Sequence, residues 1–287
     1  GYGTKMGLVP MHNWKPDAYG EAPGPVGALL SGGLTNCAFL AFLRIIQISN
    51  ASHQMEFLRP VLLALGILSI GVASFSMLRQ IDFNRLLAYS SIEHMGILIL
   101  GVGLGGVGIY GSLYHAVNNA FSKGLIFLIA GNLYQKFRSK QIRNICGAQR
   151  ALPVTGGLLL VALLAVTGIP PFGTFFSEFM ILNAALAAKH YVIAFFYLAF
   201  LSLAFIAMAA AILRMARGSP EEVGVARAQK ESWTTIISPL FLAGAALLLG
   251  FYVPPFLDQI LTKPSGVLGP AADLGATGLS QHLGAGL

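Results

Sequence analysis

Seven long apolar stretches divide this chain of 287 residues and leave little choice of fold. An apolar run of about 20 residues is long enough to cross the hydrocarbon core of a bilayer as a helix. Because a backbone inside lipid must satisfy its own hydrogen bonds, such stretches form helices. The sequence therefore predicts an all-α, multi-pass membrane bundle. The predicted spans are about 26–48, 60–79, 86–105, 108–134, 153–187, 192–214 and 235–257.

The composition supports the same class. The chain is 55% hydrophobic and 10% charged, which few soluble proteins match. Its net charge of +7 does not indicate nucleic-acid binding, because Lys and Arg gather at helix ends and in loops. Cys37 and Cys146 have no metal-site spacing and are expected to be free thiols. With no Cys or His cluster for an iron–sulfur or nickel centre, and a GVGLGG motif (101–106) that ends a membrane helix, we expect no metal and no cofactor.

The distribution of Lys and Arg predicts the topology. Twelve lie on one side of the predicted bundle and four on the other, while Lys5 and Lys123 fall at membrane depth. The positive-inside rule places the richer side in the cytoplasm and the tail, 258–287, outside. That tail is rich in Gly, Ala and Leu and is expected to be disordered. The richer group is Lys15, Arg79, Arg85, Lys136, Arg138, Lys140, Arg143, Arg150, Arg214, Arg217, Arg227 and Lys230, and the poorer is Arg44, Arg59, Lys189 and Lys263.

Lys123 carries the clearest functional signal, because it lies near the middle of the apolar stretch 108–134. An ammonium group there costs several kcal/mol unless it is paired or hydrated, so such residues commonly mark an ion path. His115 and Asn119 lie eight and four residues before it. All three therefore share one helix face over roughly 12 Å. Lys5 lies in the end of a helix predicted at 1–12 and is a second intramembrane lysine. The alternative interpretation of Lys5 and Lys123 is that each side chain snorkels to the membrane surface.

The span 153–187 is predicted to be broken. Gly168 and the Pro170–Pro171 pair interrupt it, leaving free backbone groups at membrane depth. Transporters place such breaks beside ion sites, and Glu178 follows this one closely. The alternatives are a simple kink or a tight re-entrant hairpin, with Glu178 as a carboxylate at the N-terminus of the second half.

Three other polar residues have two interpretations each. Glu93 and His94 lie early in the span 86–105, where they either feed a proton entrance or pair in the headgroup region. His115 is either a proton relay or a hydrogen-bonded core histidine. The shared face with Asn119 and Lys123 favours the relay.

Four collinear segments resemble the antiporter-like membrane subunits shared by respiratory complex I, Mrp-type antiporters and membrane-bound hydrogenases. Two of them, SSIEHMG and FFSEFM within the second and fourth segments, look most like component F of the hydrogenase-4 and formate hydrogenlyase group. The segments are GTKMGLVPMHNWKPDAYGEAPGPVGALLSGGLTNCAFLAFLR (3–44), DFNRLLAYSSIEHMG (82–96), HAVNNAFSKGLIFLIAG (115–131) and TGIPPFGTFFSEFMIL (167–182).

The resemblance implies a fourteen-helix fold with two inverted repeats of five helices and some discontinuous helices. This chain would be a C-terminal part of it, an antiporter-like domain over 1–257. Within that domain, the end of the first repeat would be 1–48, the second repeat 60–214 and the last helix 235–257.

The resemblance also implies a proton path along a central line of Lys, His and Glu. Lys5, His115, Lys123 and Glu178 match that line. The chain departs from the family pattern at Asn36, where many members carry a lysine, and at Asn119, where some carry a histidine. It also has WKPDAY, with Lys15 and Tyr19, where WLPDAH is common. The candidate path is Lys5, Asn36, Glu93, His94, His115, Asn119, Lys123 and Glu178.

The expected function is that of a proton-translocating subunit, itself non-catalytic, of a membrane-bound hydrogenase or formate hydrogenlyase type complex. It would lie in the inner (cytoplasmic) membrane, beside other membrane subunits and a peripheral hydrogenase or redox arm, without nucleic acid. The alternatives are a complex I subunit, a Mrp-type cation/proton antiporter subunit and a scaffold that does not transport. Asn36 and Asn119 favour the scaffold, whereas Lys5, Lys123 and Glu178 oppose it.

Overall fold

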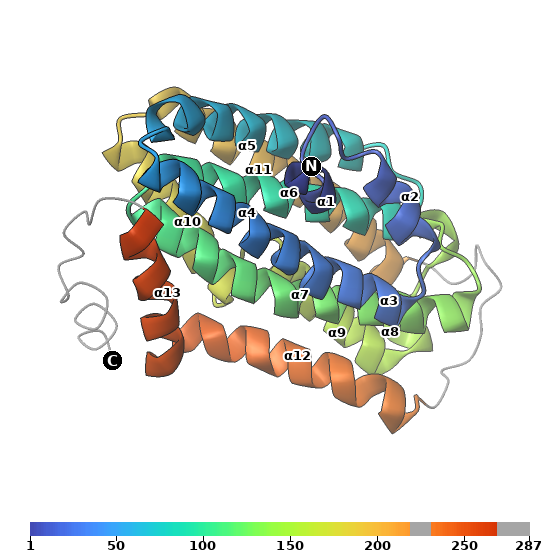
Figure 1. Ribbon diagram of the computed structural model, residues 1–287. Helices are drawn as coiled ribbons and strands as arrows, with labels where there is room; N and C mark the ends of the chain where they lie inside the picture. Colours follow the sequence, from blue (N-terminus) through green and yellow to red (C-terminus); the bar gives the residue numbers. More distant parts are fainter. Residues whose placement is uncertain (219–230, 269–287) are drawn as a thin grey trace.

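The computed structural model describes residues 1–218 and 231–268, with side chains through Lys263. Over these residues the chain is a bundle of helices without a strand, apart from one isolated bridge between Asp82 and Gln141, and the all-α prediction is confirmed (Figure 1). The elements are α1 (Tyr2–Met6), α2 (Trp14–Glu21), α3 (Gly24–Leu29), the π-helix η1 (Leu30–Leu34), α4 (Thr35–Ala51), α5 (Met55–Met77), α6 (Phe83–Leu104), α7 (Val107–Phe137), the 3-10 helix η2 (Ile142–Asn144), α8 (Ala148–Ala151), α9 (Pro153–Val166), α10 (Gly173–Ala187), α11 (Tyr191–Arg217), α12 (Trp233–Phe251) and α13 (Pro255–Leu268).

Five of the described helical segments are long and apolar enough to cross a membrane. They are Gly24–Ala51, Met55–Met77, Phe83–Leu104, Tyr191–Arg217 and Trp233–Phe251, each of which matches a predicted span. The other two predicted spans are a 31-residue helix, α7, whose centre is polar, and the shorter apolar pair α9 and α10. The break expected in 153–187 separates that pair, between Val166 and Gly173.

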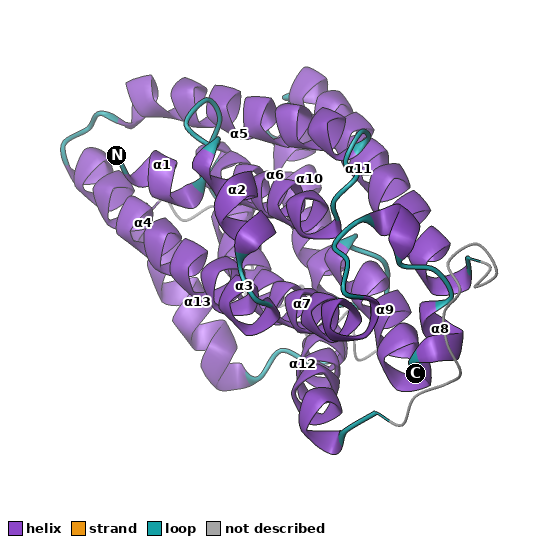
Figure 2. Cartoon of the chain, turned by 90° about the vertical axis from the view of Figure 1, so that its right-hand side faces the viewer, coloured by secondary structure: helices purple, strands orange, loops and turns teal. Residues whose placement is uncertain are grey.

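Helix α6 is the centre of the bundle. It begins at Asp82, whose carboxylate accepts a hydrogen bond from the Arg85 amide at 3.0 Å and so caps the helix. It packs against α2, α5, α7, α10 and α11 (Figure 2), and most of its residues are buried. A helix covered on all sides has no lipid face, so its polar residues must point toward protein.

Two helix irregularities border α7. The first is η1, a π-helical turn that joins α3 to α4 and carries the buried Ser31. The second is the break between α9 and α10, which is bridged by a 2.7 Å hydrogen bond from Thr174 Oγ1 to the Ala165 carbonyl. Both pack against α7. Because π-turns and helix breaks free backbone groups, they are common beside functional sites.

The predicted tail differs from the structure where it is described. Residues 258–268 belong to α13, which turns across the end of the bundle and contacts α4 and α7 (Figure 1). Pro254 and Pro255 open this helix, Leu261 is buried on its inner face, and Asp258 accepts a 2.6 Å hydrogen bond from the Tyr110 hydroxyl. The expectation of an unstructured tail was wrong here because it relied on composition and overlooked this amphipathic turn. Residues 269–287, Arg227 and Lys230 lie outside the described part of the chain.

Candidate functional site

A cluster of polar side chains lies inside the bundle, where α6, α7 and α10 meet. All its members are fully or nearly fully buried except Glu178, which is half-buried. We refer to it as the buried polar cluster. It consists of Ser90, Glu93, His94, His115, Asn119, Lys123, Ser177 and Glu178.

Lys123 lies at the middle of α7 and has no exposed surface. Its Nζ donates a 2.6 Å hydrogen bond to Ser90 Oγ. The ion pairs found in the described chain are both at the surface, Arg85–Asp17 and Lys140–Glu21, so no carboxylate contacts Lys123 directly. Glu93, one turn beyond Ser90 on α6, is the acidic group that acts on it electrostatically. Because Lys123 is completely buried, its side chain does not snorkel to the surface.

His94 and His115 form a hydrogen-bonded pair. His94 Nδ1 lies 2.9 Å from His115 Nε2, and the two rings are stacked with centroids 5.1 Å apart. His115 Nδ1 lies 2.8 Å from Ser177 Oγ, whose own proton goes to the Thr174 carbonyl at 2.7 Å. With that proton committed, neutral His115 donates from Nδ1 and accepts at Nε2 from His94.

With the hydrogen bonds in this order, His94 Nε2 carries no proton and can accept one. Nε2 is buried and has no hydrogen-bond partner among the described residues. Val166, the last residue before the helix break, lines the same cavity as His94. A buried imidazole nitrogen with a free lone pair is where an incoming proton would be bound.

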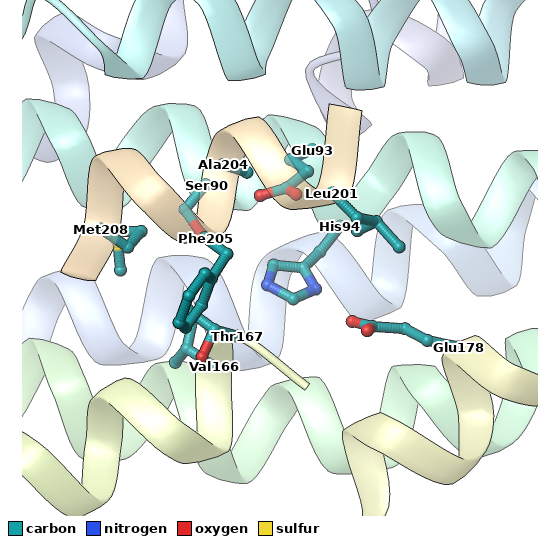
Figure 3. Close-up of a pocket in the computed structure, with 10 residues that line it drawn as sticks. All are labelled: Ser90, Glu93, His94, Val166, Thr167, Glu178, Leu201, Ala204, Phe205 and Met208. Atoms are coloured by element: carbon teal, nitrogen blue, oxygen red, sulfur yellow. The ribbon is translucent and has the colours of Figure 1, made fainter. Parts of the chain in front are cut away.

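A small cavity joins the Lys123 side of the cluster to Glu178. Its volume available to water is about 10 Å³, which holds about one molecule. Figure 3 shows the Glu178 carboxylate facing the His94 ring across this space, with Glu93 and Ser90 on the α6 side. One water molecule here would connect Ser90, the imidazole and the carboxylate. The lining residues are Ser90, Glu93, His94, Val166, Thr167, Glu178, Leu201, Ala204, Phe205 and Met208.

The same groups could be considered for a metal ion. Donor atoms of His94, His115 and Glu178 all lie within 4.8 Å of one another, and two imidazoles with a carboxylate suit Zn²⁺. Both nitrogens of His115 are, however, already engaged in hydrogen bonds, one of them to His94. In this arrangement the cluster is a hydrogen-bonded row rather than a coordination sphere.

The break between α9 and α10 positions Glu178. Gly168, within the break, has φ +60°, and a Cβ added there would lie 2.1 Å from Glu178 Oε2. Only glycine therefore permits both the backbone turn and the position of the carboxylate. The short connection also sets Ser177 against His115 and Glu178 against the cavity, which is why consecutive residues reach different parts of the cluster.

The two asparagines of the predicted path offer unsatisfied polar atoms. Asn119 lies between His115 and Lys123 on α7, is fully buried, and neither its Oδ1 nor its Nδ2 has a partner in the described structure. Asn36 donates from Nδ2 to the Ala116 carbonyl at 3.0 Å, while its Oδ1 has no partner. Buried amides are rarely left this way, so both positions suit ordered water.

The structure places some predicted residues differently. Glu93 and His94 are 5% and 2% exposed and lie near the middle of α6, not in a headgroup region; the count from the predicted helix start underestimated their depth. Lys5 is exposed on α1 and does not join the buried polar cluster, because the described chain covers α1 mainly on the side that packs against α4.

Three buried polar residues at or near the site were not identified from the sequence as candidates. Ser90 and Ser177 looked like ordinary small helix residues, although Ser90 lies four residues before His94 and Ser177 directly precedes Glu178. Lys15 was counted with the Lys and Arg of the cytoplasmic side, in the Pro- and Gly-rich connection 13–25, whereas the structure buries it completely. The signal for Lys15 was its departure, in WKPDAY, from the WLPDAH that the family resemblance led us to expect.

Ser177→Ala tests the hydrogen-bonded row. Loss of the hydroxyl leaves His115 Nδ1 without its acceptor, so the ring is less well oriented toward His94. We expect proton translocation by the full-length protein in its complex to fall about 3- to 10-fold, as for loss of roughly 1 kcal/mol of hydrogen bonding. Ser202→Ala is the matched control, because Ser202 Oγ is exposed and binds only the Leu198 carbonyl of its own helix. Equal rates in both variants would contradict a role for Ser177.

The described part of the chain is a bundle of apolar helices with two irregular helices around a buried Lys–His–Glu row, which is the architecture of a multi-pass membrane subunit. The chain belongs to the family described as "NADH:quinone oxidoreductase/Mrp antiporter, TM", whose profile matches residues 1–207. This confirms the resemblance inferred from the sequence and, with the apolar helices, a multi-pass membrane protein.

Individual relatives refine the comparison. The chain is 36% identical over 258 residues to the hydrogenase-4 component F homolog of Methylacidiphilum infernorum, covering 89% of this chain and 52% of that protein. It is 34% identical over 197 residues to NADH-quinone oxidoreductase subunit N of Desulforudis audaxviator, covering 67% of this chain and 39% of that one. A chain of the archaeal membrane-bound sulfane sulfur reductase superposes with a TM-score of 0.81 at 26% identity, over 93% of this chain and 54% of that one. The chain thus spans about half or less of the length of these relatives.

Proposed function

We propose that this chain provides the second-repeat proton path of a membrane subunit in a hydrogenase-4 or formate hydrogenlyase type redox complex. The observation that carries the proposal is the buried row in which Lys123 binds Ser90, while His94, His115 and Ser177 are hydrogen-bonded beside the cavity that Glu178 lines. The likeness to a hydrogenase-4 component F homolog supports this type of complex. The proposed setting is the inner membrane, with other membrane subunits and a peripheral redox arm.

The path would work by protonation changes alone. A proton leaves Lys123 through the Ser90 hydroxyl, so the ammonium becomes an amine. A water in the cavity passes it to His94 Nε2, and Glu178 then accepts it at the half-buried end. No bond to carbon forms or breaks, and the first transfer follows the 2.6 Å hydrogen bond from Lys123 Nζ to Ser90 Oγ.

Electron transfer in partner subunits would supply the energy. Moving one unit charge against about 100 mV requires about 2.3 kcal/mol, and buried charges respond strongly to a charge that changes nearby. In this proposal the positively charged, Lys- and Arg-rich side faces the cytoplasm and Lys123 is the group that the redox step biases.

A subunit of complex I is the second candidate, because subunit N of a NADH-quinone oxidoreductase is 34% identical to this chain. The two candidates predict the same proton path and differ in the electron acceptor. Hydrogen evolution coupled to proton movement favours the first, quinone reduction the second. Cation exchange without any redox donor would instead identify a Mrp-type antiporter.

Glu178→Gln tests the proposal in inverted membrane vesicles that contain the full-length protein in its complex. Glutamine keeps the shape of the side chain but cannot accept a proton, so we expect donor-driven lumen acidification to fall at least about 10-fold while the complex remains assembled. Hydrogen evolution is followed in parallel with formate or another electron donor. Unchanged acidification per hydrogen molecule would show that the path runs elsewhere or that the subunit is a scaffold.

A further inference from the structure

Lys15 is a fully buried lysine outside the row described above. It lies on the short helix α2, in the connection between α1 and α3, and has no exposed surface. Its Nζ donates to the Met6 carbonyl at 2.7 Å and, more weakly, to the Ser91 carbonyl at 3.4 Å. The stem passes over Gly7, where φ is +81° and an added Cβ would lie 2.5 Å from Lys15 Cδ. The local chain is thus shaped to admit this side chain.

The charge on Lys15 has no carboxylate partner among the described residues. The surface pairs of its own helix use other cations, Arg85 with Asp17 and Lys140 with Glu21. Lys15 instead meets carbonyl oxygens and, at 5.7 Å, the ring of Tyr19. Burying a cation in this way is costly.

The side chains of Lys15 and Lys123 both contact the same short segment of α6. Lys123 binds Ser90, and Lys15 binds the carbonyl of the next residue, Ser91. Ser91 Oγ in turn lies 2.8 Å from Ser31 Oγ, in the π-turn η1. The titratable groups of neighbouring helices that act on Lys15 or feel its charge are Lys123 of α7 and His94 of α6.

We propose that Lys15 is a second proton-holding lysine of the buried polar cluster, coupled to Lys123 through repulsion between two ammonium groups; the inference rests on the proposed function. Binding of a proton at Lys15 favours transfer of the Lys123 proton toward Ser90 and the cavity. Loss of the Lys15 proton favours reprotonation of Lys123. Because Lys15 binds the carbonyl of Met6, the residue after the exposed Lys5, it lies between the α1 surface and the cluster.

Lys15→Leu and Lys15→Arg test this in the full-length protein within its complex, in inverted vesicles, over a range of pH. Leucine removes the charge, and we expect donor-driven acidification to fall about 10-fold at neutral pH. Without the neighbouring cation Lys123 releases its proton less readily, so the pH profile moves upward by about one unit. Arginine keeps a charge that does not titrate, so rates fall while the profile keeps its wild-type position.

Lys140→Leu is the matched control, because Lys140 also binds a carbonyl of α2, that of Gly20, but is partly exposed and paired with Glu21. It should leave rate and pH profile unchanged. Wild-type behaviour of Lys15→Leu would overturn the inference, as would equal rate losses in both Lys15 variants with an unmoved profile, which indicate a structural tether. Absence of donor-driven acidification in the wild type would instead overturn the proposed function, and this inference with it.

Discussion

Lys123→Ala is expected to lower donor-driven acidification at least about 100-fold while the complex stays assembled. The reason is the position of Lys123: it is fully buried at the centre of α7 and donates a hydrogen bond to Ser90, which lines the cavity. Alanine leaves no group there that binds a proton. The measurement is the initial rate of lumen acidification per hydrogen molecule evolved, with assembly checked by native electrophoresis.

Two companion variants make the Lys123 result interpretable. Lys136→Ala removes a lysine from the last turn of the same helix and should leave acidification unchanged. Lys123→Arg keeps a positive charge that cannot be released, so it should be as inactive as alanine. Near-normal rates with arginine would mean that Lys123 acts as a fixed charge and not as a proton carrier.

Gly168→Ala is expected to reduce acidification at least about 10-fold and to destabilise the subunit by about 1–2 kcal/mol. Two effects combine at this position: φ is +60°, and the added Cβ would lie 2.1 Å from Glu178 Oε2. The carboxylate must therefore move away from the His94 side of the cavity. Rates in vesicles and the thermal midpoint of the solubilised complex measure the two effects separately.

The control for Gly168 is Gly157→Ala, because a Cβ at Gly157 in α9 has no neighbour within 4 Å. A double variant, Gly168→Ala with Glu178→Gln, isolates the mechanism. If Gly168 acts by positioning Glu178, the double variant should be scarcely slower than Glu178→Gln alone. Fully additive losses would show that the turn at Gly168 matters for another reason.

The bundle was predictable because the features that determine it extend over long stretches of the sequence. Apolar runs gave the spans, and the Gly and Pro residues around 168–171 gave the break. The sequence motifs indicated the family, which the comparisons confirm. The prediction that failed concerned one short segment. Helix α13 begins only a few residues after α12, and its amphipathic pattern is not visible in the composition of the tail.

The charged residues of the site could be predicted from the sequence, but the hydrogen bonds that connect them could not. An isolated Lys or Glu in an apolar helix stands out, so Lys123 and Glu178 were identified. Depth and pairing depend on which helices meet: His94 reaches His115 from 21 residues away, and Ser177 reaches it from 62. Lys15 was misplaced because a connecting segment with Pro and Gly looks like a surface loop, and only tertiary packing showed it folded against α6.

The helix α13 has a mechanical consequence. It contacts both α4 and α7 and is fastened to α7 by the hydrogen bond from the Tyr110 hydroxyl to Asp258. A helix fastened across α4 and α7 in this way resists rocking of these helices against each other, and rocking is the motion by which carriers alternate their openings. A subunit fastened in this way would pass charge through helices that keep their positions. Large movements would then take place in neighbouring subunits.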